Sequence, residues 1–263
     1  MGIKVRVDSF DLPLHYQHYK LIPTTQGVMA SVYLLDDIYV LKLFDRDTPL
    51  TIIDAEIKLL NELQGLPLPH VVERFQIKEH EVVIFTQIAG EMPVVPTLEN
   101  IRQIGSFLKR FHAQTKKISF NKENLFSTNR VANLIVLTKN KVLQKHFESI
   151  KLILQDDGVI HGDLFPDNCK FLEGMLSGVY DFSDASIGDF HFELAVITSA
   201  WCFDGAVLNQ EKMNLLLDTY KYKKDSKRAE FIVYVKYALL YYVTTRFIAG
   251  RDYQELLERL ENL

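Results

Sequence analysis

The sequence predicts an α+β protein with two lobes, a small one rich in strands and a larger one made mainly of helices. Within the first eighty-odd of its 263 residues, short runs rich in β-branched and aromatic residues flank a single helical pattern. The rest of the chain shows mostly apolar residues at helical spacing. Pro93 and Pro96 break the regular pattern between these two parts. Strands that are segregated from helices along a chain are typical of the α+β class.

The N-terminal part is expected to contain a hairpin and one later strand. Residues 31–35 and 39–44 are short β-rich runs, and Asp36 and Asp37 between them have the composition of a tight turn. Residues 81–87 form a further run of this kind. The predicted boundaries are 1–87 for the N-terminal lobe, 88–96 for a hinge and 97–263 for the C-terminal lobe.

Helical patterns stand out at three places in the chain. In the N-terminal lobe, Thr51 and Asp54 have the spacing of a capping box, and Gly65 marks the end of the helix. In the C-terminal lobe, a long amphipathic helix is predicted by apolar residues at helical spacing, namely Ile101, Ile104, Leu108 and Phe111. Residues 231–249 are apolar enough to resemble a membrane span, but Lys236 and Arg246 would each cost roughly 2.5–3.5 kcal/mol at a bilayer centre. We therefore expect a buried helix there.

The composition narrows the classes of function. A formal net charge of −4 without a clustered basic face argues against nucleic acid or an anionic membrane as a partner. The two cysteines, Cys169 and Cys202, have neither zinc-ligand nor disulfide-framework spacing. The first residues lack the apolar stretch of a signal peptide. These features predict a compact cytoplasmic protein and leave its oligomeric state open.

Residues 159–182, VIHGDLFPDNCKFLEGMLSGVYDF, carry the pattern most closely tied to chemistry. A hairpin is expected over 169–180, and its antiparallel return would bring Asn168 and Asp181 to the same open end. Asp163 stands five residues before Asn168. Because carboxylate and amide oxygens suit a hard cation, this arrangement predicts magnesium-assisted phosphoryl transfer. The alternative is that these polar residues only form turns.

The same segment resembles the catalytic and metal-binding loops of protein kinases, through the His-x-Asp-x-x-x-x-Asn spacing at 161–168 followed by Asp-Phe at 181–182. Its Gly-Asp form, and the pattern at 188–195, are similar to the aminoglycoside phosphotransferase superfamily. Within that superfamily the chain most resembles the homoserine kinases, through HGDLFPDN at 161–168, LSGVYDFSDA at 176–185 and AWCFD at 200–204. The resemblance implies a two-lobed protein-kinase-like fold, a small-molecule hydroxyl substrate, and ATP and Mg²⁺ as cofactors.

The resemblance also implies a role for each matching residue. Asp163 would orient and deprotonate the acceptor hydroxyl, while Asn168 and Asp181 would hold magnesium. His161 would be a structural residue that fixes the loop. Independently of the resemblance, Asp189, which an aromatic residue follows, is expected to be a structural acid that braces the loop.

Lys42 and Glu56 are a second expected pair. Lys42 lies in the apolar run 39–44, and Glu56 falls on the apolar stripe of the following helix rather than on its solvated face. A carboxylate there requires a cation, so we expect an ion pair in which Lys42 also contacts the nucleotide phosphates. The alternative is that the two are unrelated residues at the rim.

The remaining nucleotide contacts have weaker signals. The loop at 26–31, QGVMAS, has one glycine and lacks the G-x-G-x-x-G pattern. Its backbone amides from Met29 to Ser31 are candidates to cover the phosphates, although the segment could also be a simple turn. From their position after the strand at 81–87, Gln87 and Ala89 are expected to offer main-chain hydrogen bonds to the adenine edge.

The sequence says less about the acceptor. Homoserine would require a cation for its carboxylate and an acidic group for its ammonium. Arg246 is the candidate for the carboxylate, with a structural ion pair as the open alternative, and Asp184 is the candidate for the ammonium. A mixed lining of the acceptor site is expected from Trp201, Tyr237, Tyr241, Tyr242 and Arg246.

Three functions are hypotheses at this point. The first is a kinase for homoserine. The second is a kinase of the same superfamily for an aminoglycoside, choline or another small alcohol, although a site for polycations should be strongly acidic. The third is a catalytically silent fold used for binding, which would normally have lost one of Lys42, Asp163, Asn168 and Asp181.

Overall fold

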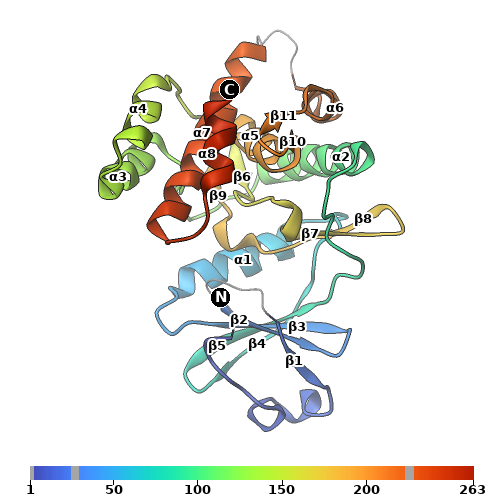
Figure 1. The fold of residues 1–263 in the computed structure, drawn as a ribbon. Coiled ribbons are helices and arrows are strands. Elements are labelled where there is room, and N and C mark those ends of the chain that lie inside the picture. Colours follow the sequence, from blue (N-terminus) through green and yellow to red (C-terminus); the bar gives the residue numbers. More distant parts are fainter. Residues whose placement is uncertain (1–2, 25–29, 223–227) are drawn as a thin grey trace. The chain divides into compact units, whose positions relative to one another are not determined.

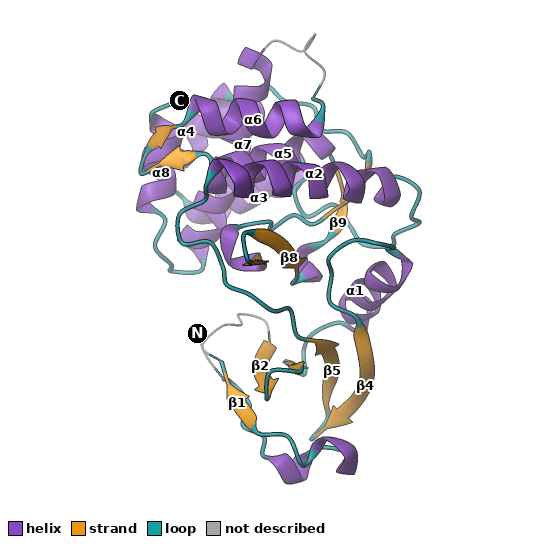
Figure 2. Ribbon diagram, turned by 90° about the vertical axis from the view of Figure 1, so that its right-hand side faces the viewer, coloured by secondary structure: helices purple, strands orange, loops and turns teal. Residues whose placement is uncertain are grey.

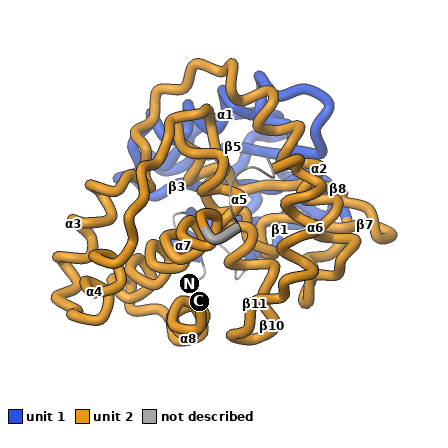
Figure 3. The backbone as a smooth tube through the Cα atoms, turned by 90° about the horizontal axis from the view of Figure 1, so that it is seen from above, with its two compact units in different colours: residues 1–89 blue, residues 90–263 orange. Residues whose placement is uncertain are grey.

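The computed structural model describes residues 3–24, 30–222 and 228–263. The chain divides into two compact units, Met1–Ala89 and Gly90–Leu263, which Figure 3 shows in different colours. Strands dominate the first unit and helices the second (Figure 2). This distribution confirms the predicted α+β class.

Unit 1 is built on one five-stranded antiparallel sheet in the order β1-β2-β3-β5-β4 (Figure 1). Its strands are β1 (Leu21–Pro23), β2 (Ala30–Leu35), β3 (Tyr39–Phe44), β4 (Val71–Ile77) and β5 (His80–Thr86). The predicted hairpin and the later strand are therefore present within one residue of their expected bounds. The helix α1 (Leu50–Glu62) and the short 3₁₀ helices Ser9–Asp11 and Leu14–Tyr16 complete the unit.

The two faces of this sheet differ because successive side chains of a strand point in opposite directions. Leu41 and Leu43 of β3 belong to a buried cluster with Leu12, Tyr16, Tyr33, Leu35, Ile77, Val82 and Ile84. Lys42, between these two leucines, points to the opposite face. There its ammonium meets Glu56 of α1, so α1 covers that second face.

The start of α1 differs from the prediction. The helix begins at Leu50, directly after Pro49, and no side chain caps its N-terminus. Thr51 therefore lies inside the first turn, and Asp54 accepts a hydrogen bond from Arg74 of β4 at 2.5 Å instead of completing a capping box. The proline fixes its own φ at −59° and brings the chain into the helix before Thr51 can act as a cap.

Unit 2 contains seven α-helices among its described residues: α2 (Leu98–Thr115), α3 (Thr128–Thr138), α4 (Lys141–Ser149), α5 (Phe190–Trp201), α6 (Gln210–Tyr220), α7 (Arg228–Ile248) and α8 (Gln254–Glu261). The four apolar residues that predicted α2 are all fully buried. Helix α2 packs beside α6, and α5 packs beside α7 (Figure 2).

Short antiparallel strand pairs complete unit 2. They are β6 (Gly158–Ile160) with β9 (Ser186–Gly188), β7 (Cys169–Leu172) with β8 (Met175–Val179), and β10 (Phe203–Asp204) with β11 (Val207–Leu208). The predicted hairpin over 169–180 is the β7–β8 pair.

Helix α7 contains the segment that resembles a membrane span. Glu230–Ile248 passes the length and hydropathy test for a span, and half of that window is buried inside the protein. The helix packs against α3, α4, α5 and α8, as a core helix would.

Candidate active site

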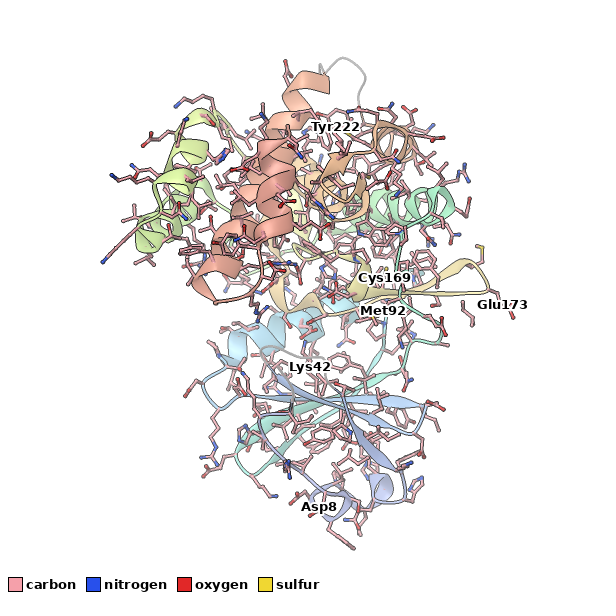
Figure 4. All side chains as sticks on the ribbon, viewed as in Figure 1. Asp8, Lys42, Met92, Cys169, Glu173 and Tyr222 are labelled. Carbon is pink, nitrogen blue, oxygen red and sulfur yellow. The ribbon has the colours of Figure 1, made fainter. Side chains whose placement is uncertain are left out.

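The β7–β8 hairpin sets the positions of the two expected metal ligands. In Figure 4, Cys169 lies at one end of the hairpin and Glu173 at the other. At the Cys169 end, the Tyr180 amide donates a hydrogen bond to the carbonyl of Asn168 at 3.0 Å. Asn168 and Asp181 are therefore neighbours across the open end of the hairpin, as the sequence predicted.

Asn168 connects this end of the hairpin to Asp163. Its Nδ2 donates to the Asp163 carbonyl oxygen at 2.7 Å and to the Asp163 carboxylate Oδ2 at 3.1 Å. The amide nitrogen is thus used to hold Asp163, and the side-chain oxygen Oδ1 is the atom of Asn168 with the chemistry to ligate a cation. The single turn of 3₁₀ helix at Pro166–Asn168 brings the two residues together.

Asp181 adopts an uncommon backbone conformation. Its φ of 64° and ψ of 69° lie in the left-handed region, which aspartate tolerates better than most residues other than glycine. Ser183 Oγ donates to Asp181 Oδ1 at 2.6 Å, and the residue is exposed. The carboxylate is therefore oriented but accessible, which suits a metal ligand.

The electrostatics of this cluster fit a cation. Burial raises the pKa of Asp163 well above its usual value, and the nearby carboxylates of Asp184, Asp181 and Asp167 raise it further, while the Asn168 hydrogen bond opposes them. Among the described residues, no group of three or more His, Cys, Asp or Glu side chains could hold a metal. Magnesium does not require one, because it binds through one or two carboxylates together with water and phosphate oxygens.

His161 fixes the loop that carries Asp163. It is fully buried, its Nδ1 lies 3.2 Å from the Asp163 amide, and its Nε2 lies 3.0 Å from the Tyr180 carbonyl. Because the amide is a donor and the carbonyl an acceptor, the ring carries its proton on Nε2. His161 therefore ties Asp163 to the residue just before Asp181.

The acid that braces the loop is Glu193 rather than Asp189. Glu193 Oε1 accepts a hydrogen bond from the Gly162 amide at 2.8 Å. Asp189 instead caps α5, accepting from the amides of His191 and Phe192, and also binds the Gln155 amide. Glu193 stands in the sequence pattern at 188–195, but its position inside a helix gave no sign that it would face the loop.

The expected acceptor-site lining also requires correction. Trp201 is fully buried and its indole N–H donates to the Leu164 carbonyl at 2.9 Å, so the side chain supports the loop instead of facing an open site. Tyr237 and Tyr242 are also buried, and their hydroxyls bind the carbonyls of Phe126 and Gly162. Large aromatic residues give no sequence signal that separates a core position from a site lining.

The Lys42–Glu56 pair has the expected geometry. Lys42 Nζ lies 3.1 Å from both carboxylate oxygens of Glu56. The side chains are 11% and 4% exposed, so the pair is largely removed from water. Figure 4 labels Lys42 on unit 1. An ion pair in such surroundings holds the ammonium in one place.

The other residues expected to contact the nucleotide differ in burial and in their hydrogen bonds. Ser31 is fully buried and its hydroxyl accepts hydrogen bonds from the amides of Lys4 and Val5, so its side chain anchors the N-terminal segment. The Gln87 amide donates to the Ile38 carbonyl at 2.9 Å, so this amide is already occupied within unit 1. Ala89 is exposed at the end of unit 1. Met29 lies outside the described residues.

Arg246 lines a cavity of about 200 Å³ in unit 2, with Phe165, Ala200, Asp252, Tyr253, Glu255, Leu256 and Arg259. Its guanidinium lies over the Phe165 ring, 5.7 Å from the centroid. Within the described part of the chain, Arg246 has no carboxylate within ion-pair distance, whereas Arg259 is paired with Glu255 at 2.5 Å. Phe165 follows Asp163 by two residues, and its amide donates to the Asp163 carbonyl. Asp184, also half-buried, lies close enough to raise the pKa of Asp163.

The chain is similar in sequence to known kinases and in structure to known phosphotransferases. The homoserine kinase of Methylocella silvestris is 26% identical to this chain, and the match covers 88% of this chain and 81% of the relative. Among solved structures, the ADP-bound aminoglycoside phosphotransferase APH(2'')-Ib matches with a TM-score of 0.59 and 20% identity over 92% of each chain. The ternary complex of APH(2'')-IIa with streptomycin and ATP matches with a TM-score of 0.63 and 18% identity, over 98% of this chain and 96% of that one.

At these identities the structural matches show the fold, which is that of the aminoglycoside phosphotransferases. Residues 20–220 match the model of the phosphotransferase enzyme family, and this stretch includes β1 to β5, the loop at 161–168 and the β7–β8 hairpin. The chain therefore belongs to the phosphotransferase enzyme family.

Proposed function

We propose that the chain is an ATP-dependent kinase that transfers the γ-phosphoryl group to the hydroxyl of a small molecule, with homoserine as its acceptor. The observation that carries the proposal is the arrangement of Asp163, Asn168 and Asp181. One hydrogen-bonded carboxylate lies beside an amide oxygen and an exposed carboxylate at the end of one hairpin. This set of groups is what phosphoryl transfer to an alcohol requires.

In this proposal Asp163 orients the acceptor hydroxyl and takes its proton as the oxygen attacks the γ-phosphorus. The bond to Asn168 Nδ2 holds the carboxylate in position for this transfer. Asn168 Oδ1 and the Asp181 carboxylate would hold magnesium, which when bound supplies positive charge to the phosphate oxygens. Lys42, fixed by Glu56, would contact the phosphates, and Gln87 and Ala89 would offer main-chain groups to the adenine.

Two observations favour homoserine among the possible acceptors. Homoserine kinases are among the relatives with similar sequences, and the cavity beside the loop contains a guanidinium without a carboxylate partner among the described residues. A half-buried guanidinium of this kind suits the carboxylate of an amino acid. Asp184, close to Asp163, would accept the ammonium group.

The main alternative is a polycationic acceptor such as streptomycin, which the structural neighbour APH(2'')-IIa binds. The cavity does not favour it. Arg246 and Arg259 both line the cavity, and their two positive charges offset the two negative charges of Asp252 and Glu255. A polycation requires a clear excess of negative charge.

A coupled assay of ATP turnover against homoserine, threonine, serine, choline, methylthioribose and kanamycin tests the proposal. Homoserine should give the highest kcat/KM. Turnover with another alcohol and none with homoserine would overturn the acceptor and leave the kinase assignment, while no turnover with any alcohol would overturn both.

Arg246→Met tests the carboxylate contact directly. A desolvated, charged contact of this type is worth about 2–5 kcal/mol when its partner is left unpaired, so kcat/KM for homoserine should fall at least about thirtyfold. The KM for ATP should stay near that of the wild type, because the contact is made to the acceptor alone. Arg251→Met, which removes an exposed arginine outside the cavity lining, serves as the matched control. An equal loss toward both substrates would show that Arg246 has a structural role.

A further inference from the structure

The peptide groups on both sides of Gly162 are bound by buried side chains. The Gly162 amide donates to Glu193 Oε1 at 2.8 Å, and the Gly162 carbonyl accepts a hydrogen bond from the Tyr242 hydroxyl. Gly162 directly precedes Asp163, so the second of these peptide groups also contains the Asp163 amide, which donates to His161. The direction in which Asp163 leaves the main chain is therefore set by side chains of α5 and α7.

These contacts are made away from water. Glu193 is 0% exposed and Tyr242 is 7% exposed. Burial, and then the charge of Asp163, raise the pKa of Tyr242 well above its usual value, so its hydroxyl keeps the proton that it donates. In a buried site no solvent molecule replaces a lost partner, so each of these hydrogen bonds constrains the loop more than an exposed one would.

Glu193 is itself held by the buried His112, which in turn contacts the half-buried Tyr220. His112 Nε2 of α2 lies 2.6 Å from Glu193 Oε2, and His112 Nδ1 lies 2.8 Å from the Tyr220 hydroxyl of α6. The His112 ring stacks on Phe190 with 3.8 Å between ring centroids and an angle of 8°. One consistent assignment has Tyr220 donating to Nδ1 and Nε2–H donating to Glu193, which leaves Oε1 directed at Gly162.

Gly162 also has no freedom to move aside. Its φ is 80°, a conformation that favours glycine, and an added Cβ would lie 2.5 Å from the Phe126 ring. The main chain is thus packed against Phe126 while Glu193 and Tyr242 bind it.

We propose that Glu193 and Tyr242 are positioning residues that act on Asp163 through Gly162, a role that rests on the assignment of Asp163 as the catalytic base. Phosphoryl transfer depends on the placement of the base, and a shift of about 1 Å in such a group can cost about 100-fold in rate. The pair therefore controls turnover without touching nucleotide or acceptor.

The test begins with Tyr242→Phe, which removes one hydroxyl and keeps the ring that packs against Phe165. We expect kcat to fall about tenfold or more, with the KM values for ATP and homoserine unchanged within about twofold. Tyr33→Phe is the matched control, because its buried hydroxyl also donates to a main-chain carbonyl, that of Val5 in unit 1, and it should leave kcat unchanged. A kcat for Tyr242→Phe equal to that of the control overturns the proposal.

A double-mutant cycle separates positioning from general loosening of the fold. If Tyr242 acts through Asp163, the double variant Asp163→Asn/Tyr242→Phe should be no slower than Asp163→Asn alone. If the two losses multiply, Tyr242 acts elsewhere and the proposal is wrong. Near wild-type turnover in Asp163→Asn alone would instead remove the catalytic base itself, which is a different result.

Glu193→Gln provides an independent arm if Tyr242→Phe does not fold. It keeps the size and one acceptor oxygen of Glu193 but removes the charge that both the Gly162 amide and His112 face. The expected result is again a lower kcat with unchanged KM values, absent in the Asp163→Asn background. A rise in KM for either substrate, or a loss that persists in that background, contradicts the positioning role.

Discussion

Lys42 in unit 1 and Asp163 in unit 2 are ionisable groups that their surroundings hold in different ways. Lys42 is held through its own ammonium, by a carboxylate 14 residues away in the sequence. Asp163 is held mainly through the main chain of its loop, which binds Glu193, Trp201 and Tyr242 at sequence separations of 31, 37 and 80 residues. The first arrangement fixes the position of the Lys42 ammonium, whereas the second fixes the direction in which the Asp163 side chain leaves the main chain.

The difference has consequences for mutagenesis. Removing one member of a buried ion pair leaves the other charge without its partner, so the main loss is in stability. Removing a side chain that binds the loop leaves Asp163 chemically intact but less well placed, so the main loss is in turnover. Substitutions in the two units can test this difference, and the largest effect is expected at the proposed metal ligands.

Asp181→Ala should abolish magnesium-dependent nucleotide binding and turnover while the protein stays folded. The side chain is exposed and accepts a hydrogen bond from the Ser183 hydroxyl, so its removal leaves no buried charge. Titration calorimetry with ATP, with and without magnesium, measures the effect, and Asn168→Ala should weaken the same step. Asp167→Ala removes another exposed carboxylate, from the loop at 161–168, and should retain binding. Unchanged affinity and activity in Asp181→Ala would remove the metal assignment.

Asp163→Asn should reduce turnover roughly 100-fold or more, because a positioned base contributes about 10²–10⁴. ATP affinity should change little, since Asn168 and Asp181, and not Asp163, are the proposed metal ligands. Steady-state kinetics together with nucleotide titration separates the two effects. If turnover stays near that of the wild type, Asp163 is not the catalytic base and its loop has no role in positioning one.

The grouping of the main candidate residues could be predicted from the sequence. Asp163, Asn168 and Asp181 lie on one hairpin and its preceding loop, so spacing alone places them together. Lys42 and Glu56 could be paired because a carboxylate on an apolar helix stripe requires a cation. In both cases the signal is local, because the interacting groups lie on adjacent elements of the chain.

The support of the loop could not be predicted in this way. Glu193, Tyr242 and Trp201 lie on helices whose apolar sequences fit a core, and nothing in a helical pattern tells which residue faces a distant main-chain group. The sequence therefore predicts Trp201 in the acceptor site and Asp189 beside the loop, although the first lies in the core and the second caps α5. Contacts between distant helices depend on tertiary packing, which spacing does not encode.

Lys42→Met tests how much the buried ion pair contributes to stability. It removes the cation that Glu56 contacts in a largely buried site, which should lower the free energy of unfolding by about 3 kcal/mol or more. The expected fall in Tm is about 6 °C or more. In Lys42→Met/Glu56→Leu the apolar side chains match the surrounding core, so most of this stability should return.

ATP binding should stay weak in both of these variants, because the ammonium is missing from each. Thermal melts and nucleotide titrations of the same samples supply the two readouts. Full recovery of ATP affinity in the double variant would show that Lys42 serves the fold and not the nucleotide.

The smallest expected effect is on the stability of Asp163→Asn without magnesium. Burial and the neighbouring carboxylates raise the pKa of Asp163 in the folded state, so the folded protein binds this proton more tightly than the unfolded chain does. The contribution of the group to the free energy of unfolding is therefore greatest below its unfolded pKa and is lost as the pH rises through the folded one. The asparagine carries no charge and escapes this loss, so Tm of the variant relative to the wild type should rise as the pH is raised above about 4, the pKa of an aspartate in an unfolded chain. Asp37→Asn, in the exposed β2–β3 turn, should show no such trend. A difference in Tm that is constant with pH, or that falls, would show that ionising the Asp163 carboxylate does not destabilise the fold. The loop would then orient the Asp163 side chain without placing its charge in an unfavourable environment.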